Sequence, residues 1–210
     1  MTDITEQIRT HRLLPVIALE EAALAVPLAD ALIQAGLPCA EITLRTPSAL
    51  DAIRALKDRS ELLLGAGTVH SAEQAKDAVA AGAQFIISPG FNLRTVTWCL
   101  ENRVPIYPGI SSPTDLESAM EAGLETVKFF PAESLGGVAM LKALVAPYHE
   151  MNFIPTGGIT TLNLADYMAI PNVIACGGSW MVSKDLLNDG NFEMIRQRTT
   201  EALELLKNLP

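Results

Sequence analysis

Thr126-Val127-Lys128-Phe129-Phe130-Pro131 is a short stretch with a lysine among apolar residues. It is apolar, partly aromatic and ends at a proline, which predicts a short β-strand. A strand of this composition is usually buried on both faces in a parallel sheet. Burying an ammonium group is costly unless it is paired or loses its proton. Lys128 therefore either reaches solvent from the strand end or lies in a cavity with a chemical purpose.

Seven further apolar runs surround this strand, and their centres follow one another at steps of 20 to 26 residues. They are residues 13–19, 40–45, 62–67, 84–89, 104–110, 152–158 and 173–180. Eight such runs alternating with helices predict a parallel β/α architecture.

Helix signals lie between the runs. Thr46-Pro47 and Ser112-Pro113 each predict an N-cap followed by proline at the first helical position, and Ser71 with Gln74 predicts a capping box. Three similar fragments are expected to end helices shortly before a strand, as in a weakly repeated βα unit. These fragments are Ala35-Gly36-Leu37, Ala81-Gly82-Ala83 and Ala122-Gly123-Leu124. Pro27 fits the first turn of a helix, and residues 2–12 predict a short amphipathic helix before the first strand.

Two closures of such a sheet compete, a (β/α)8 TIM barrel and an open doubly wound sheet. An open sheet should carry a Gly-rich dinucleotide loop after its first strand, whereas Leu19-Glu20-Glu21 stands there. The even spacing and the count of eight favour the barrel. No linker or low-complexity run interrupts the series, so we expect residues 1–210 to form a single (β/α)8 domain with a short N-terminal helix.

Charge and composition limit the possible partners. The chain has 210 residues, 49% of them hydrophobic, and a net charge of −9. Such an acidic chain is a poor candidate for binding nucleic acid or anionic membranes, and no apolar run has the roughly 20 residues of a membrane span. Three widely separated cysteines and a polar N-terminus without a signal-peptide core indicate a cytoplasmic protein. The three histidines show no HxxxH or HxH pairing, so we expect no metal site.

Catalytic groups of a barrel lie at the C-terminal ends of its strands, where Glu41 and Lys128 stand out. A lysine desolvated in a barrel can attack a carbonyl to form a Schiff base, and a carboxylate can shuttle the protons that this chemistry needs. The alternative is a buried Lys–Glu salt bridge without chemistry, although such pairs often stabilise no better than apolar residues.

Other strand ends carry candidate anion-binding groups. Arg45 could hold a substrate carboxylate with Thr68 as its neighbour, or it could be an ordinary surface arginine. Gly157-Gly158 and Gly177-Gly178-Ser179 follow the last two runs, where barrels commonly bind phosphate through backbone N–H groups. The alternative for the glycines is ordinary tight turns.

Several motifs together resemble 2-keto-3-deoxy-6-phosphogluconate (KDPG) aldolase, in the order of that family and without departures. They are Glu41-Ile42-Thr43-Leu44-Arg45-Thr46, Gly65-Ala66-Gly67-Thr68-Val69, Ser88-Pro89-Gly90, Lys128-Phe129-Phe130-Pro131-Ala132-Glu133, Pro155-Thr156-Gly157-Gly158 and Gly177-Gly178-Ser179-Trp180. Each motif is weak alone, but the set is specific and covers residues 41–180.

The resemblance implies a cofactor-free class I aldolase of the Entner–Doudoroff pathway, a homotrimer with a phosphorylated keto sugar acid as substrate. It makes Lys128 the Schiff-base lysine and Glu41 the general acid/base. It assigns the pyruvyl end of the substrate to Arg45, Thr68, Pro89, Phe130 and Thr156. It assigns the phosphate to Gly157, Gly158, Gly177, Gly178 and Ser179.

The resemblance leaves the substrate open, because the family also includes 4-hydroxy-2-oxoglutarate aldolases and enzymes acting on the galactonate epimer. Two rivals from other classes are a metal-dependent aldolase or sugar-phosphate isomerase, and a non-catalytic barrel that senses a phosphorylated metabolite. The absence of a His/carboxylate cluster counts against the metal enzyme, and the presence of Lys128 counts against the sensor.

Overall fold

Nine short strands, all pairing in parallel, form the centre of the described part of the chain. The structure is a computed structural model that describes residues 3–207 and 209. The strands are β1 (Leu13–Ile17), β2 (Cys39–Thr43), β3 (Leu63–Gly67), β4 (Phe85–Ile87), β5 (Ile106–Tyr107), β6 (Gly109–Ile110), β7 (Thr126–Phe129), β8 (Asn152–Pro155) and β9 (Cys176–Gly178).

The strands lie in two sheets and not in one continuous eight-stranded ladder, which corrects the sequence-based expectation. Among the described residues, one sheet has the order β5-β4-β3-β2-β1-β9 and the other β6-β7-β8. The fifth predicted run is divided at Pro108, which has no N–H group to donate to a ladder. At the other junction, isolated parallel bridges join Phe153 to Val173 and Thr156 to Gly177. The fold is thus α/β with curled parallel sheets.

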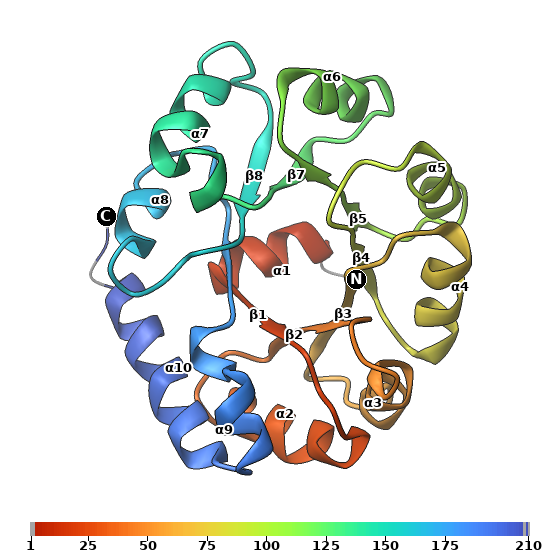
Figure 1. Cartoon of the computed structure of the whole chain (residues 1–210), viewed down its shortest axis with the longest axis vertical. Helices are drawn as coiled ribbons and strands as arrows, with labels where there is room; N and C mark the ends of the chain where they lie inside the picture. The colour runs from red at the N-terminus through yellow and green to blue at the C-terminus, as the bar shows by residue number, and fades with distance from the viewer. Residues whose placement is uncertain (1–2, 208, 210) are drawn as a thin grey trace.

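Helices surround the strands in a ring (Figure 1). The α-helices are α1 (Ile4–His11), α2 (Ala25–Gln34), α3 (Ala49–Leu56), α4 (Ala72–Ala81), α5 (Leu93–Glu101), α6 (Pro113–Glu121), α7 (Gly137–Val145), α8 (Leu164–Met168), α9 (Lys184–Asn188) and α10 (Phe192–Lys207). Short 3-10 helices are η1 (Ala22–Leu24), η2 (Glu133–Leu135) and η3 (Trp180–Val182). The predicted N-terminal helix is confirmed as α1, which crosses the ring in the view of Figure 1. Its Thr5 hydroxyl lies 2.9 Å from the Tyr107 hydroxyl of β5.

Two of the three predicted N-caps are confirmed. The Ser71 hydroxyl accepts a hydrogen bond from Gln74 N–H at the start of α4, and Ser112 caps α6 with Pro113 in its first turn. The prediction for Thr46-Pro47 is wrong, because α3 begins only at Ala49. The Thr46 hydroxyl instead donates to the carbonyl of Leu19, which ties the β2–α3 loop to the end of β1.

The three predicted helix ends share one hydrogen-bond pattern. The N–H groups of Leu37, Ala83 and Leu124 each donate to the carbonyl five residues earlier. The intervening glycines have positive φ, as this C-terminal motif requires. Helix α5 ends with the same bond, from Val104 N–H to the Cys99 carbonyl, but with Arg103 at φ 57° in place of glycine.

Candidate active site

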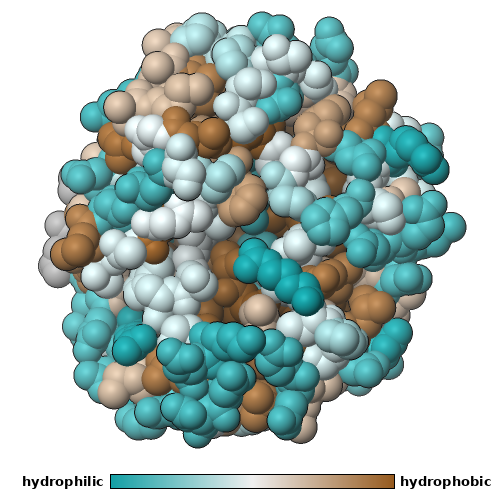
Figure 2. Space-filling model, in the orientation of Figure 1, coloured by the Kyte–Doolittle hydropathy of each residue, from teal (hydrophilic) through white to brown (hydrophobic). Residues whose placement is uncertain are grey.

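A cavity of about 400 Å³ opens at the C-terminal ends of the strands. In the view of Figure 2, white and brown surface lies in the middle of the face, and a strongly hydrophilic side chain crosses it. The cavity is lined by Val16, Arg45, Thr68, Pro89, Lys128, Phe130, Thr156, Gly157, Gly158, Ile159, Gly177, Gly178 and Ser179. Every predicted site residue except Glu41 is in this set.

Lys128 lines the cavity, and Glu41 lies next to it, outside the lining. Lys128 is only 3% exposed and Glu41 is fully buried. The Lys128 Nζ lies 3.6 Å from the Glu41 Oε1, and neither carboxylate oxygen has a hydrogen-bond partner within the described chain. A buried carboxylate without hydrogen bonds costs stability, on the order of 1–3 kcal/mol or more. Both oxygens thus lack a donor inside the described chain and have the Lys128 ammonium group as their charged neighbour.

Gly67 creates the space for this carboxylate. Gly67 is the last residue of β3 and pairs with Thr43 of β2, the strand that carries Glu41. A Cβ atom at Gly67 would lie 2.0 Å from the Glu41 Oε1. Residue 67 must therefore lack a side chain for Glu41 to keep its position.

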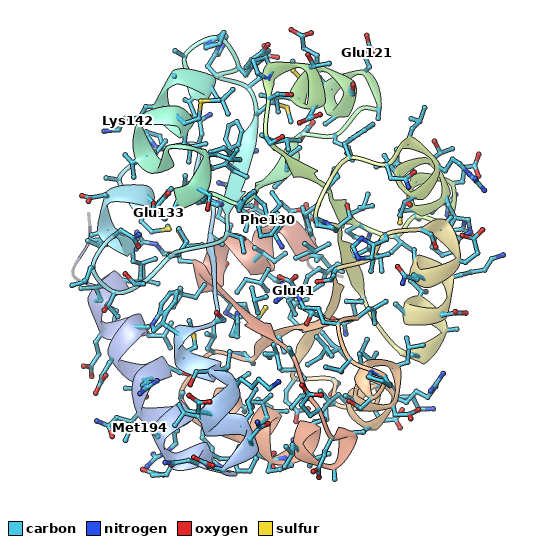
Figure 3. The ribbon with its side chains drawn as sticks, viewed as in Figure 1. Glu41, Glu121, Phe130, Glu133, Lys142 and Met194 are labelled. Atoms are coloured by element: carbon cyan, nitrogen blue, oxygen red, sulfur yellow. The ribbon has the colours of Figure 1, made fainter. Side chains whose placement is uncertain are left out.

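Phe130 forms an aromatic wall beside the lysine. Phe130 directly follows β7 and is two residues from Lys128, the spacing that places side chains on one side of an extended chain. The Lys128 Nζ lies 4.9 Å from the centre of the Phe130 ring, within the range of a cation–π contact. Figure 3 shows Phe130 and Glu41 both directed into the middle of the ring of strands.

Arg45 and Thr68 meet at the rim. The Arg45 Nε donates a hydrogen bond of 3.1 Å to the Thr68 hydroxyl, and Arg45 is exposed. Thr68 has φ 58°, which is rare for a β-branched residue and costs backbone strain. Such strain is typical of functional sites, and here it places the Thr68 side chain on the cavity wall beside a guanidinium group.

The three carbonyl groups of the turn at residues 156–158 all accept hydrogen bonds from groups of the described chain. In order, these carbonyls accept hydrogen bonds from Ala132 N–H (2.8 Å), Glu133 N–H (3.0 Å) and the Asn163 Nδ2 (3.1 Å). Within the described chain, the N–H groups of Gly158 and Ile159 make no hydrogen bond, whereas the Gly157 N–H faces β9 in the parallel bridge between Thr156 and Gly177. Free N–H groups of this kind form an anion-binding concavity.

The second glycine pair is held by close packing. A Cβ atom at Gly177 would lie 2.3 Å from the Thr156 hydroxyl oxygen, and one at Gly178 would lie 1.7 Å from the Trp180 ring. These contacts bring the end of β9 against the 156–158 turn, where Ser179 is exposed on the cavity wall.

The cysteines lie apart from this chemistry. Burial raises the pKa of Cys39 far above its usual range, and the nearby charge of Glu41 adds to the rise. Burial also raises the pKa of Cys99 to about 12 and that of Cys176 still further. All three cysteines are free and buried. Among residues 3–207 and 209, no group of three or more His, Cys, Asp or Glu side chains could hold a metal ion.

A family model described as "KDPG and KHG aldolase" matches residues 4–198. The chain belongs to this aldolase family. It is 50% identical over 207 residues to 2-dehydro-3-deoxy-phosphogluconate aldolase of Treponema pallidum, covering 98% of this chain and 99% of that protein. It is 43% identical to the KHG/KDPG aldolase of Escherichia coli strain K12, covering 93% and 92% of the two chains.

A solved aldolase structure has the same fold. The crystal structure of KDPG aldolase from Legionella pneumophila superimposes with a TM-score of 0.92 at 37% identity, covering 96% of this chain and 98% of that one. That protein holds pyruvate captured at low pH as a covalent carbinolamine intermediate.

Sequence reasoning missed three contributors to the site of this aldolase. Val16 and Ile159 line the cavity, and Gly67 makes room for the carboxylate. Val16 is the centre of the first predicted run, and only the end of β1 at Ile17 places it near the cavity. Ile159 directly follows the glycine pair. Gly67 was part of a quoted motif, but only the structure shows which side chain occupies its space.

No helix among the described residues is both long and apolar enough to cross a bilayer.

Proposed function

We propose that this aldolase reversibly cleaves 2-keto-3-deoxy-6-phosphogluconate to pyruvate and glyceraldehyde 3-phosphate. The observation that carries the proposal is a buried lysine that lines an open cavity and whose Nζ lies 3.6 Å from a carboxylate without hydrogen bonds. The two relatives named above as phosphogluconate or KHG/KDPG aldolases support the choice of substrate.

Lys128 acts as the nucleophile and Glu41 as the proton shuttle. The amine adds to the C2 carbonyl, Glu41 moves the protons, and loss of water leaves an imine. The imine accepts the electron pair of the C3–C4 bond as a base removes the C4 hydroxyl proton, and the aldehyde leaves. The remaining enamine is protonated at C3 and hydrolysed, which releases pyruvate and the free lysine. No cofactor is needed.

The pyruvyl end binds beside Lys128. Arg45 is the only arginine among the cavity-lining residues and can fork onto the substrate carboxylate beside Thr68. Pro89, Phe130 and Thr156 complete this end of the cavity.

The phosphate binds at the two glycine pairs. The unpartnered N–H groups of Gly158 and Ile159 support this assignment, together with the end of β9 and the Ser179 hydroxyl. Remote binding of this type positions the reacting end of the substrate.

A second candidate reaction is the cleavage of 4-hydroxy-2-oxoglutarate. The name of the E. coli relative, KHG/KDPG aldolase, favours it. A third, cleavage of the galactonate epimer, differs in configuration at C4 and would use the same lysine.

We further infer that residues 1–210 form one domain, in which the two sheets act as a single (β/α)8 barrel. The bridges between β8 and β9 and the continuity of β5 and β6 through Pro108 support this. We also propose a homotrimer in the cytoplasm. Three buried cysteines, all free in the described chain, fit a reducing compartment.

The test is reductive trapping. Sodium borohydride with pyruvate should attach a pyruvate-derived group to Lys128, detected by intact mass and peptide mapping. Lys142, exposed on α7 (Figure 3), supplies the matched control. Lys142→Arg should label as the wild type does, and Lys128→Arg should not label. Modification at another lysine, or none, would remove the Schiff-base mechanism.

A further inference from the structure

The loop after β7 packs against the 156–158 turn through Glu133. Besides the hydrogen bond from its N–H to Gly157, its side chain occupies the space beside the next residue. A Cβ atom at Gly158 would lie 2.6 Å from the Glu133 Cγ and 2.7 Å from its Cβ. The Glu133 side chain therefore packs directly against Gly158 of the turn.

The Glu133 carboxylate, at the other end of this side chain, is bound by Tyr167 of α8. The Tyr167 hydroxyl donates to the Glu133 Oε1, and Tyr167 is fully buried. Burial, and next the hydrogen bond to Glu133, raise the pKa of Tyr167 well above its usual range, so its hydroxyl keeps the donated proton. Figure 3 shows Glu133 close to α8.

The same carboxylate lies at the start of α7. A Cβ atom at Gly137, the first residue of that helix, would lie 2.8 Å from the Glu133 Oε1 and 3.2 Å from the Tyr167 hydroxyl. A helix N-terminus favours a negative charge. The carboxylate thus has two stabilising neighbours, and neither Glu133 nor Tyr167 is among the residues lining the cavity.

We propose that Glu133 and Tyr167 are positioning residues that hold the 156–158 turn in its anion-binding form and so set the preference for a phosphorylated substrate. This inference rests on the proposed phosphate site. Backbone N–H groups bind an anion well only when they are already oriented, because reorienting them costs free energy. The tyrosine also keeps the carboxylate, which would repel phosphate, directed toward α7.

The test compares substrate preference in matched variants. Tyr167→Phe removes one buried hydroxyl. Tyr148→Phe is the control, since the Tyr148 hydroxyl donates a similar bond of 2.8 Å to Glu117, outside the cavity lining. The readout is the ratio of kcat/KM for 2-keto-3-deoxy-6-phosphogluconate to that for 4-hydroxy-2-oxoglutarate, with inhibition by inorganic phosphate as a second measurement.

We expect Tyr167→Phe to lower this ratio roughly tenfold and to weaken phosphate inhibition, on the scale of one hydrogen bond to a charged group. Tyr148→Phe should keep the wild-type ratio. Equal losses on both substrates, or an unchanged ratio, would overturn the inference. If Tyr167→Phe fails to fold, Glu133→Ala replaces it as the test variant, because Glu133 is exposed. The same ratio of kcat/KM values should then fall in Glu133→Ala.

Ser179→Ala separates this inference from the proposed function. A lower ratio in Ser179→Ala with an unchanged ratio in Tyr167→Phe would overturn the positioning role alone. Unchanged ratios in both variants, with trapping at Lys128 intact, would reject the phosphate site, and the positioning role with it.

Discussion

Glu41 is a buried carboxylate with no hydrogen-bond donor among the described residues and one ammonium group 3.6 Å away. Replacing both partners of such a pair by apolar residues is often neutral or stabilising, so stability does not explain why the pair is present. A group that must exchange protons with a substrate needs free oxygens, and Glu41 has them.

At this scale, we expect Glu41→Gln to keep the fold and lower kcat by roughly 10²–10⁴-fold, the usual contribution of a positioned acid/base. The amide has nearly the same shape but cannot shuttle the proton. Steady-state kinetics with circular dichroism would check this, and Glu121→Gln, exposed on α6 (Figure 3), is the control. Turnover near wild type would make Glu41 a structural partner of Lys128 only.

Gly67→Ala provides a companion variant. The added Cβ would meet the Glu41 Oε1 at 2.0 Å, so the carboxylate must move. Turnover should fall in the same direction, and in a Glu41→Gln background the change should have a smaller effect, because the two act through one group.

At the scale of the elements, the helices differ in which residue type occupies the position of positive φ at their C-terminal end. Helices α2, α4 and α6 end at glycines with positive φ, whereas α5 ends at Arg103 with φ 57°. A residue with a Cβ atom is strained in this region by roughly 1–2 kcal/mol, and glycine is not.

We therefore expect Arg103→Gly to stabilise the protein by about 0.5–1 kcal/mol, the relief of strain less the extra entropy of the unfolded glycine. Urea unfolding would measure it. Arg94→Gly, in the first turn of the same helix, should instead destabilise, as glycine does within helices. A loss of stability in Arg103→Gly would show that the arginine side chain contributes more than its backbone costs.

At the scale of the whole molecule, an acidic chain must bind a substrate that carries a carboxylate and a phosphate. The net charge is −9, yet the charged residues that line the cavity are Arg45 and Lys128. Positive charge and the free N–H groups of Gly158 and Ile159 thus lie on one cavity where the strands end, so an anion that entered it would meet both.

Because the imine itself withdraws electrons from the C3–C4 bond, we expect activity to survive prolonged dialysis against EDTA. The measurement is the rate of pyruvate release before and after dialysis, with Mg²⁺ or Zn²⁺ added back. Loss of activity that a divalent ion restores would favour the metal-dependent rival.

Features that depend on neighbours in sequence could be predicted from the sequence alone. The alternation of apolar runs and helices, the caps at Ser71 and Ser112 and the glycine helix ends are local, because a few consecutive residues supply both hydrogen-bond partners. The strand lysine and the glycine pairs could also be identified from the sequence, because a lysine is unusual within an apolar strand and paired glycines are unusual at strand ends.

Features that depend on residues distant in sequence were decided only by the tertiary structure. The division of the fifth run at Pro108 depends on which strand each half meets, and Thr46 bonds to Leu19 across two elements instead of capping α3. The space at Gly67 exists for Glu41, and the turn at Gly158 rests on Glu133, because packing brings these atoms within contact distance. Local sequence does not indicate such contacts. The reacting residues could therefore be predicted from the sequence, but the residues that position them could not.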